Sequence, residues 1–225
     1  MKPAPRIKIC GLMDTKTILE MDGLPIHEIG FVFAPSKRQV AGAAAAELIA
    51  AAKQLKAADG ERPLTVGVFV NEAFAHLAAI QAEVKLDVIQ LHGSESAEYC
   101  RDVRERLNAQ VWKVFSMKKA SEGQVPQSAS ERLSPYHASV DAVLIDAPGG
   151  GTGQTFDWDA ISDYKQAAGE LGITLYVAGG LHEGNVQELL GAYSPGGIDV
   201  SSGVETNGRK DIEKIRLFVR RVMEA

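Results

Sequence analysis

The chain has 225 residues, 45% of them hydrophobic, with 24 basic and 29 acidic side chains and a formal net charge of −5. This length supports one sizeable core and suits a single domain over 1–225, and the mild acidity argues against a nucleic-acid partner. The longest apolar run, 41–52, contains Glu47 and predicts an amphipathic helix, not a membrane span. The N-terminus lacks an apolar signal region, so we expect a cytoplasmic protein whose Cys10 and Cys100 are free thiols.

Short β-branched runs alternate with helix-like segments along the whole chain. Strands are expected at 6–10, 28–33, 64–70, 87–91, 111–116, 140–146, 173–178 and 197–201. Helices are expected at 14–22, 40–57, 73–83, 95–107, 120–132, 157–168, 183–191 and 210–222. These eight units predict an α/β fold, a single (β/α)8 TIM barrel, with an open doubly wound sheet as the alternative. Closure is favoured because polar residues recur at the ends of the strands, where such a barrel has its site.

The first strand places Lys8 and Cys10 on one face, opposite Ile7 and Ile9, because side chains alternate along a strand. A nearby cation lowers the pKa of a thiol, so Cys10 has the features of a catalytic base supported by Lys8. The alternative is that Cys10 is a small buried apolar residue, as free cysteines commonly are. Cys100 lies within a predicted helix without comparable neighbours and is expected to be a plain core residue.

Three polar residues follow the next strands in positions that leave their roles open. Arg38 lies in the loop after the second strand, where its planar guanidinium suits a carboxylate but is also compatible with a solvated loop cation. Asn71 follows the third strand and is expected to cap the next helix. His92 ends the fourth strand and either lines a pocket or satisfies a loop carbonyl. The residues alone leave Lys113, in the fifth strand, unassigned.

Asp146 stands where the apolar sixth strand meets the glycine-rich run 149–153. The next helix is expected only near Asp157, which is the better cap, so Asp146 is a candidate for chemistry. The glycines let the loop approach a ligand closely, although the run does not match the P-loop pattern.

The loops after the seventh and eighth strands predict a phosphate site. They contain Gly179, Gly180, Ser201, Ser202 and Gly203, which offer backbone N–H groups and hydroxyls. Loops at these two positions form the recurrent phosphate site of the TIM barrel.

In a closed barrel the eighth strand lies beside the first. We therefore expect Asp199 to pair with Lys8 inside the barrel, because an unpaired buried charge is costly. In that case Lys8 orders the barrel wall and does little to the pKa of the Cys10 thiol.

Ordered motifs run across nearly the whole chain. In chain order they are Lys8-Ile9-Cys10-Gly11, Gly30-Phe31-Val32-Phe33 with Ser36-Lys37-Arg38, Gly67-Val68-Phe69-Val70-Asn71, Gln90-Leu91-His92-Gly93, Ile145-Asp146 with Gly150-Gly151-Thr152-Gly153, Phe156-Asp157-Trp158, Ala178-Gly179-Gly180-Leu181, Asn185-Val186 and Asp199-Val200-Ser201-Ser202-Gly203-Val204-Glu205. Together these motifs resemble the phosphoribosylanthranilate isomerase family of tryptophan biosynthesis. The segment from His182 to Gly184 departs from the family pattern, and the role of His182 stays open.

The resemblance implies a (β/α)8 barrel that performs an Amadori rearrangement without metal or other cofactor. The substrate would be N-(5-phosphoribosyl)anthranilate and the product 1-(2-carboxyphenylamino)-1-deoxyribulose 5-phosphate, in the third step of tryptophan synthesis from chorismate. By this resemblance Asp146 is the general acid, Cys10 the general base and Arg38 the ligand of the anthranilate carboxylate. The substrate would also contact His92, Gly179, Gly180, Asp199, Ser201, Ser202 and Gly203.

Two alternatives remain at this point, another phosphosugar barrel and a non-catalytic barrel that keeps its phosphate loops. The histidine-pathway isomerase works with two aspartates, so Cys10 argues against it, and the Cys10 and Asp146 pair argues against a binding protein. The expected partner is a small phosphosugar, with neither nucleic acid nor membrane, and the chain is expected to be a monomer or a weak homodimer.

Overall fold

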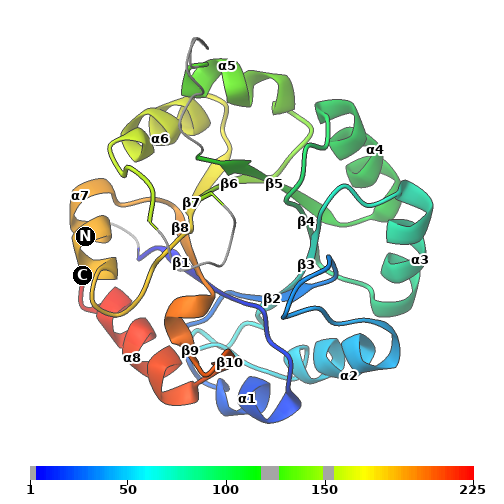
Figure 1. Cartoon of the computed structure of the whole chain (residues 1–225), viewed down its shortest axis with the longest axis vertical. Helices are drawn as coiled ribbons and strands as arrows, with labels where there is room; N and C mark the ends of the chain where they lie inside the picture. The colour runs from blue at the N-terminus through cyan, green and yellow to red at the C-terminus, as the bar shows by residue number, and fades with distance from the viewer. Residues whose placement is uncertain (1–3, 118–126, 149–154) are drawn as a thin grey trace.

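Eight parallel strands follow one another around a closed barrel, and the helices surround it (Figure 1). The structure is a computed structural model that describes residues 4–117, 127–148 and 155–225. The barrel closes where β1 pairs with β8, in a register that sets Lys8 beside Asp199. The predicted TIM barrel is therefore confirmed, and the open doubly wound sheet is excluded.

Each predicted strand is present. Their bounds are β1 Arg6–Cys10, β2 Glu28–Val32, β3 Leu64–Phe69, β4 Val88–Leu91, β5 Gln110–Ser116, β6 Ala142–Asp146, β7 Thr174–Val177 and β8 Gly197–Val200. A further two-stranded hairpin, β9 Glu205–Thr206 and β10 Arg209–Lys210, follows the short 3-10 turn Ser202–Val204.

The helices lie outside the barrel, one after each of its strands (Figure 1). Their bounds are α1 Thr15–Glu20, α2 Gly42–Ala52, α3 Phe74–Val84, α4 Ala97–Leu107, α5 Ala129–Leu133, α6 Ala160–Glu170, α7 Val186–Tyr193 and α8 Ile212–Met223. Within the part of the chain that the structure describes, none of these helices is both long and apolar enough to cross a bilayer.

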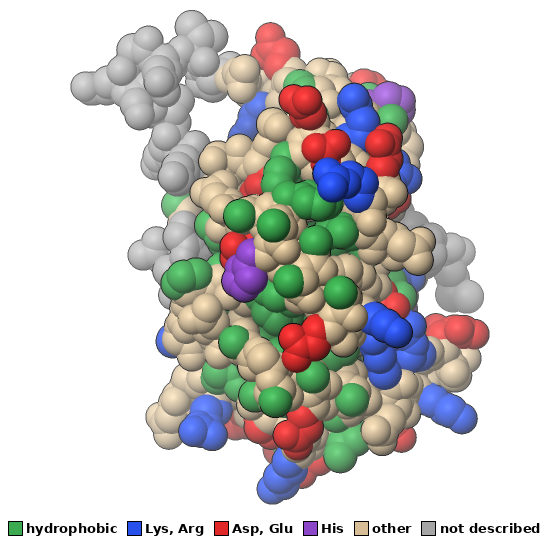
Figure 2. All heavy atoms as spheres, turned by 90° about the vertical axis from the view of Figure 1, so that its right-hand side faces the viewer, with side chains coloured by type: hydrophobic (Ala, Val, Ile, Leu, Met, Phe, Trp, Pro, Cys, Tyr) green, Lys and Arg blue, Asp and Glu red, His purple; other side chains and the backbone are tan. Residues whose placement is uncertain are grey.

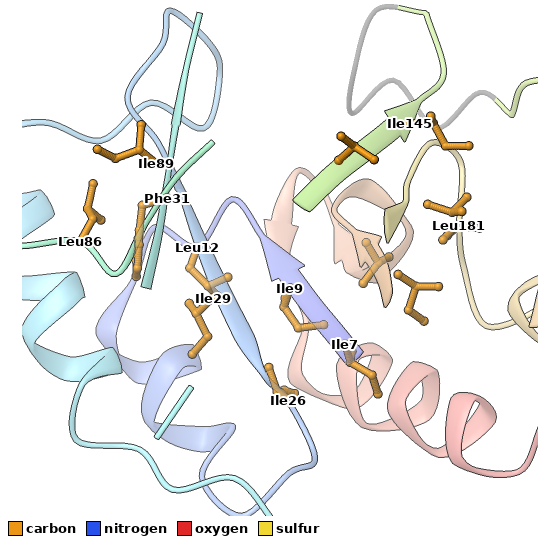
Figure 3. Packing of buried hydrophobic residues seen from close by; sticks show 14 of the residues in the cluster. Ile7, Ile9, Leu12, Ile26, Ile29, Phe31, Leu86, Ile89, Ile145 and Leu181 are labelled. Carbon is orange, nitrogen blue, oxygen red and sulfur yellow. The ribbon is translucent and has the colours of Figure 1, made fainter. Parts of the chain in front are cut away.

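The alternation of side chains along the strands divides the buried residues into two layers. Ile7 and Ile9 point outward from β1 into the layer between the sheet and the helices (Figure 3). The barrel interior holds the other apolar cluster, which is Val66, Val88, Trp112, Val114, Ala142, Leu144, Tyr176 and Ala178. Lys8 and Cys10 lie on the inward face with this second cluster, as the alternation predicts.

Several predicted helix boundaries differ from the structure: α2 ends at Ala52 and not at 57, and α7 begins at Val186 and not at 183. α6 begins at Ala160 and not at 157, because Asp157 accepts a hydrogen bond from the Asp159 N–H (3.1 Å) in a preceding turn and does not cap the helix. α8 begins at Ile212 because 209–210 form the second strand of the hairpin. Of the helix expected at 120–132, residues 120–126 lie outside the described residues, and the described helix is Ala129–Leu133.

Candidate active site

A pocket of about 400 Å³ opens at the carboxyl ends of the barrel strands. Nine of the residues singled out in the sequence line it: Cys10, Arg38, His92, Asp146, Gly179, Gly180, Asp199, Ser201 and Ser202. Lys8 and Gly203 do not line it, since Lys8 is fully buried beneath the pocket and Gly203 packs behind the neighbouring loop. The fold thus gathers residues from six separate parts of the chain around one cavity.

Lys8 is held by Asp199, as expected from the closure of the barrel. The Lys8 Nζ donates a hydrogen bond to Asp199 Oδ2 at 2.9 Å, and both side chains are almost completely buried. Asp199 Oδ1 has no hydrogen-bond partner among the described residues. Burial alone would lower the pKa of Lys8, but Asp199 and Cys10 outweigh it and raise the pKa, so this lysine is cationic.

Cys10 ends β1 directly above Lys8, and Gly30 on β2 leaves the room for its thiol. A Cβ at position 30 would lie 2.8 Å from Cys10 Sγ. Burial raises the pKa of the Cys10 thiol, and the positive charges of Lys8 and Lys210 oppose this without reversing it. Lys8 therefore lowers the pKa of the thiol as expected, but desolvation is the larger effect and the net shift of the pKa is upward.

Asp146 ends β6 as a buried carboxyl group next to His92. Its Oδ2 lies 3.5 Å from His92 Nε2. Burial, together with the negative charge of Asp199, raises the pKa of Asp146 to about 7. Burial lowers the pKa of His92 to about 4, so the imidazole beside Asp146 is neutral near neutral pH. A carboxyl group with such a pKa is partly protonated at neutral pH and can donate a proton to a ligand.

Arg38 forms an ion pair with Glu205. Glu205 belongs to one of the family motifs, but the sequence alone indicates no role for it. Arg38 Nε donates to Glu205 Oε1 at 2.6 Å, and Arg38 Nη2 donates to Glu205 Oε2 at 3.0 Å. Lys210 Nζ donates to the same Oε1 at 2.6 Å. Burial would raise the pKa of Glu205, but the hydrogen bonds from Arg38 and Lys210 lower it to about 2. The solvated-cation interpretation of Arg38 is therefore excluded, because its side chain is buried in this cluster.

Lys210 was missed in the sequence, although a signal for its position was present. Asn207 and Gly208 have φ values of 53° and 76°, and such an Asn-Gly pair is the typical turn of a two-residue hairpin. The hairpin sets Lys210 opposite Glu205. The side chain of Lys210 also donates to the Ser201 carbonyl oxygen at 3.0 Å. Burial lowers the pKa of Lys210, and Glu205 opposes that shift.

The loops after β7 and β8 pack tightly enough to require glycine. Gly179 has a φ of 88°, and a Cβ there would lie 2.6 Å from the Ala147 nitrogen. A Cβ on Gly203 would collide with the Leu181 carbonyl oxygen. Ser201 Oγ donates to the Cys10 carbonyl oxygen at 3.1 Å and so fastens this loop to β1. His182, left open in the sequence, accepts a hydrogen bond from the Gly184 N–H at its Nδ1 (3.1 Å) within an exposed turn.

Lys113 and Asn71 have structural positions outside the pocket. Lys113 forms a buried ion pair with Glu95 (3.1 Å) and donates to the Gly93 carbonyl oxygen (2.8 Å). The sequence predicts that Asn71 caps α3, and this prediction is wrong. Its Oδ1 instead accepts a hydrogen bond from the Ser94 N–H at 2.7 Å, which ties the β3–α3 loop to the loop that follows His92.

The described residues contain no group of three or more His, Cys, Asp or Glu side chains placed to hold a metal ion. Both cysteines, Cys10 and Cys100, are free thiols, as the sequence predicts. The whole glycine-rich run 149–153 lies outside the described residues, so its predicted contact with a ligand stays a prediction.

Comparisons with known proteins agree with this geometry. A family model described as N-(5'phosphoribosyl)anthranilate (PRA) isomerase matches residues 7–221. The N-(5'-phosphoribosyl)anthranilate isomerase of Brevibacillus brevis is 42% identical over 221 residues, which cover 96% of this chain and 93% of the relative.

Solved structures of the same kind share the fold. A phosphoribosyl anthranilate isomerase in complex with reduced 1-(o-carboxyphenylamino)-1-deoxyribulose 5-phosphate superposes with a TM-score of 0.77 and 29% identity, over 98% of this chain and all (100%) of that one. A structure described as mutually generated monomers of the dimeric enzyme of Thermotoga maritima has the same TM-score of 0.77, 29% identity and the same coverage, 98% and 100%. The chain therefore belongs to the N-(5'-phosphoribosyl)anthranilate isomerase family and is an isomerase of this kind.

Proposed function

We propose that Asp146 and Cys10 act as acid and base in the Amadori rearrangement of N-(5-phosphoribosyl)anthranilate to 1-(2-carboxyphenylamino)-1-deoxyribulose 5-phosphate. The observation that carries the assignment is the pairing of a buried carboxyl group, whose pKa is raised to about 7, with a thiol lining the same pocket. Neither group needs a metal or a redox cofactor for this role, since each only transfers a proton while the bonds rearrange within the substrate.

Asp146 is the proton donor of the first step. Opening of the ribose ring breaks the bond between C1 and the ring oxygen, and that oxygen must receive a proton. The protonated Asp146 delivers it, while the lone pair of the anthranilate nitrogen forms the C1–N double bond of a Schiff base. The neutral His92 at 3.5 Å contacts the carboxyl group without adding a positive charge that would favour its ionised form.

Cys10 is the base of the second step. The Schiff base acidifies the proton on C2, and the Cys10 thiolate removes it to give an enolamine, which then tautomerises to the ketone. The thiol must first ionise against its burial, and Lys8 and Lys210 supply the positive charges that favour this. Lys8 acts on the thiol through space while it remains bound to Asp199.

The two ends of the substrate are bound by different loops. Arg38 binds the anthranilate carboxylate, for which its planar guanidinium is suited. The phosphate lies between the loops of Gly179 and Gly180 and of Ser201, Ser202 and Gly203. Asp199 Oδ1 accepts a hydrogen bond from a substrate hydroxyl, since this oxygen lacks a hydrogen-bond partner among the described residues. This arrangement places C1 and C2 between Asp146 and Cys10.

The protein acts as a cytoplasmic enzyme and as a monomer or a weak homodimer. Among the described residues, the large apolar side chains that are exposed are Leu19, Val70 and Met223. On the face shown in Figure 2, many apolar side chains are separated from one another by backbone and polar atoms. Light scattering after gel filtration, over a range of protein concentrations, tests this. A constant dimer mass at all concentrations would contradict it.

The activity and the two assignments are tested by one assay. Purified protein is mixed with freshly prepared N-(5-phosphoribosyl)anthranilate, and the loss of anthranilate-type fluorescence is followed. Cys10→Ala and Asp146→Asn should each lower kcat by roughly 10²–10⁴-fold, as expected when one positioned acid or base is lost. Cys100→Ala, at the other buried thiol, is the matched control and should keep its activity. Near-full turnover by either variant would refute that assignment, whereas wild-type decay at the spontaneous rate would refute the activity.

A further inference from the structure

The hairpin of β9 and β10 lies outside the eight-stranded barrel, yet one of its cross-strand pairs contacts Arg38 and Ser201, which line the pocket. Glu205 and Lys210 face each other across the hairpin, and the tight turn at Asn207 and Gly208 fixes this register. Arg209, the neighbour of Lys210, is exposed and pairs in register with Thr206. The hairpin therefore aims one of its two adjacent cations inward and the other into solvent.

Glu205 and Lys210 form a buried charge cluster with Arg38. The exposed fractions of the Arg38, Glu205 and Lys210 side chains are 7%, 5% and 1%. Glu205 accepts from Arg38 through both oxygens, which is the bidentate arrangement that fixes a guanidinium plane. The stem of Arg38 crosses the turn after Cys10, since a Cβ on Gly11 would lie 2.5 Å from Arg38 Cδ. A long, flexible side chain is thus held in one position at the rim of the pocket.

The charges of this cluster decide what it attracts. Arg38 and Glu205 by themselves would be a neutral pair, whose carboxylate would repel an anionic ligand. Lys210 compensates that carboxylate, so the cluster keeps one net positive charge beside the pocket. A cation that is already oriented loses less conformational freedom on binding a carboxylate than a free arginine would.

We propose that Glu205 and Lys210 are positioning residues for Arg38, Glu205 by fixing its guanidinium and Lys210 by restoring the positive charge that Glu205 neutralises. This inference rests on the proposed binding of the anthranilate carboxylate by Arg38. It gives the hairpin a function in substrate affinity. The effect falls on KM more than on kcat, because the carboxylate is remote from C1 and C2 and is bound equally in the ground and transition states.

Lys210 makes a second contact, which offers a different explanation for any effect of its removal on KM. Lys210 Nζ donates to the Ser201 carbonyl oxygen at 3.0 Å, so its loss also touches the proposed phosphate loop. If Lys210 acts through that loop, its removal weakens phosphate binding whether or not Arg38 is present. If it acts through Arg38, its removal has no further effect once Arg38 is gone, because burial then favours the neutral form of Glu205, which no longer has a cation beside it.

The experiment compares steady-state kinetics of Lys210→Met, Glu205→Gln and Arg38→Met with those of the Lys210→Met/Arg38→Met double variant. Lys210→Met should raise KM about 10-fold, since one nearby charge in a protein interior is worth on the order of a tenfold change in affinity. The loss of its charge near Cys10 should lower kcat by a smaller factor. Glu205→Gln should also raise KM, and the double variant should match Arg38→Met alone. Lys210→Arg, which keeps the charge, should restore KM, and Arg209→Met, which removes the solvent-facing cation, should leave the kinetics unchanged.

Inorganic phosphate as a competitive inhibitor reports on the phosphate loop separately. Its inhibition constant should be the same in wild type and Lys210→Met. A weaker phosphate inhibition together with multiplying effects in the double variant would overturn the inference in favour of the loop. An unchanged KM in Lys210→Met, with a raised KM in Arg38→Met, would also overturn it and leave the role of Arg38 intact. An unchanged KM in Arg38→Met would instead refute the proposed carboxylate site itself.

Circular dichroism and thermal melts establish that each variant is folded. If Lys210→Met does not fold, Glu205→Gln and Lys210→Arg carry the test. A Glu205→Gln protein with wild-type KM would then refute the inference, and so would a Lys210→Arg protein with the KM of Arg38→Met.

Discussion

Lys8 on β1 donates a hydrogen bond of 2.9 Å to Asp199 on β8, across the seam at which the barrel closes. The two residues are far apart in the chain and directly adjacent in the sheet. This pairing satisfies a fully buried ammonium group and places it beneath Cys10. Lys8 is therefore a part of the barrel wall whose charge also acts on the thiol.

Removing Lys8 should destabilise the protein. Lys8→Met leaves Asp199 buried without its partner, and breaking a buried pair in this way costs about 3–5 kcal/mol. We expect the free energy of unfolding, measured by urea denaturation, to fall by that amount. The double variant Lys8→Met/Asp199→Asn, which removes both charges, should be more stable than Lys8→Met alone. A Lys8→Met protein as stable as wild type would show that the pair is not needed for closure.

The rate should depend on pH through Asp146 and Cys10 together. The active form has Asp146 protonated and Cys10 ionised, yet the pKa of Asp146 is about 7 and burial raises that of the thiol above its ordinary value. The acid thus ionises at a lower pH than the base. The fraction in the active form rises with pH until Asp146 ionises, stays level between the two pKa values, and falls once the thiol has ionised.

A profile of kcat/KM at constant ionic strength tests this order of ionisation. It should rise up to about pH 7, the pKa of Asp146, and then become level. In Asp146→Asn, which cannot ionise, the break near that pH should vanish from the residual activity. A wild-type rate that falls with pH through this region would mean that the thiolate is already formed there, contrary to its burial.

Gly203 should be required for the packing of the loops after β7 and β8. A side chain at this position collides with the Leu181 carbonyl oxygen, so Gly203→Ala must displace one of the two loops. We expect a lower melting temperature and weaker inhibition by inorganic phosphate. Gly191→Ala in α7 is the matched control, because a Cβ there meets no atom within 4 Å. It should be neutral or stabilising by up to about 1 kcal/mol, since alanine favours a helix. Equal behaviour of the two variants would contradict the tight packing at Gly203.

Asp87 should contribute stability that is lost in acid. Burial would raise its pKa, but hydrogen bonds from Arg62 and Thr65 lower it to about 2. Because the folded pKa lies below the unfolded value of about 4, the contribution is complete above that value and disappears as the pH falls towards 2. We expect Asp87→Asn to lose about 1–2 kcal/mol at neutral pH, allowing for partial exposure to solvent.

Urea denaturation of wild type and Asp87→Asn at several pH values measures this contribution. The difference in stability should shrink as the pH falls through the window between the two pKa values. A difference for Asp87→Asn that stays constant down to strongly acidic pH would contradict the lowered pKa.

Local pattern was enough to predict the parts of the site that depend on strand geometry. The alternation of Lys8 and Cys10 with Ile7 and Ile9 assigns the inward face of β1, and closure of eight strands places Asp199 beside Lys8. The carboxyl ends of parallel strands meet at one end of a barrel, so the sequence alone predicts a common site for Asp146 and Cys10. Lys8 on the same strand face indicates the base role of Cys10, the family motifs add the acid role of Asp146, and both roles are proposals.

Other features depended on contacts that no local pattern contains. The eight strands, their inward faces and the residues at their ends could be predicted from the chain, because they follow from short-range periodicity. The enclosure of Arg38 by Glu205 and Lys210, and the larger effect of burial than of Lys8 on the pKa of Cys10, depend on the folded arrangement. Desolvation and ion pairing depend on which distant segments surround a group, and that arrangement exists only once the chain has folded.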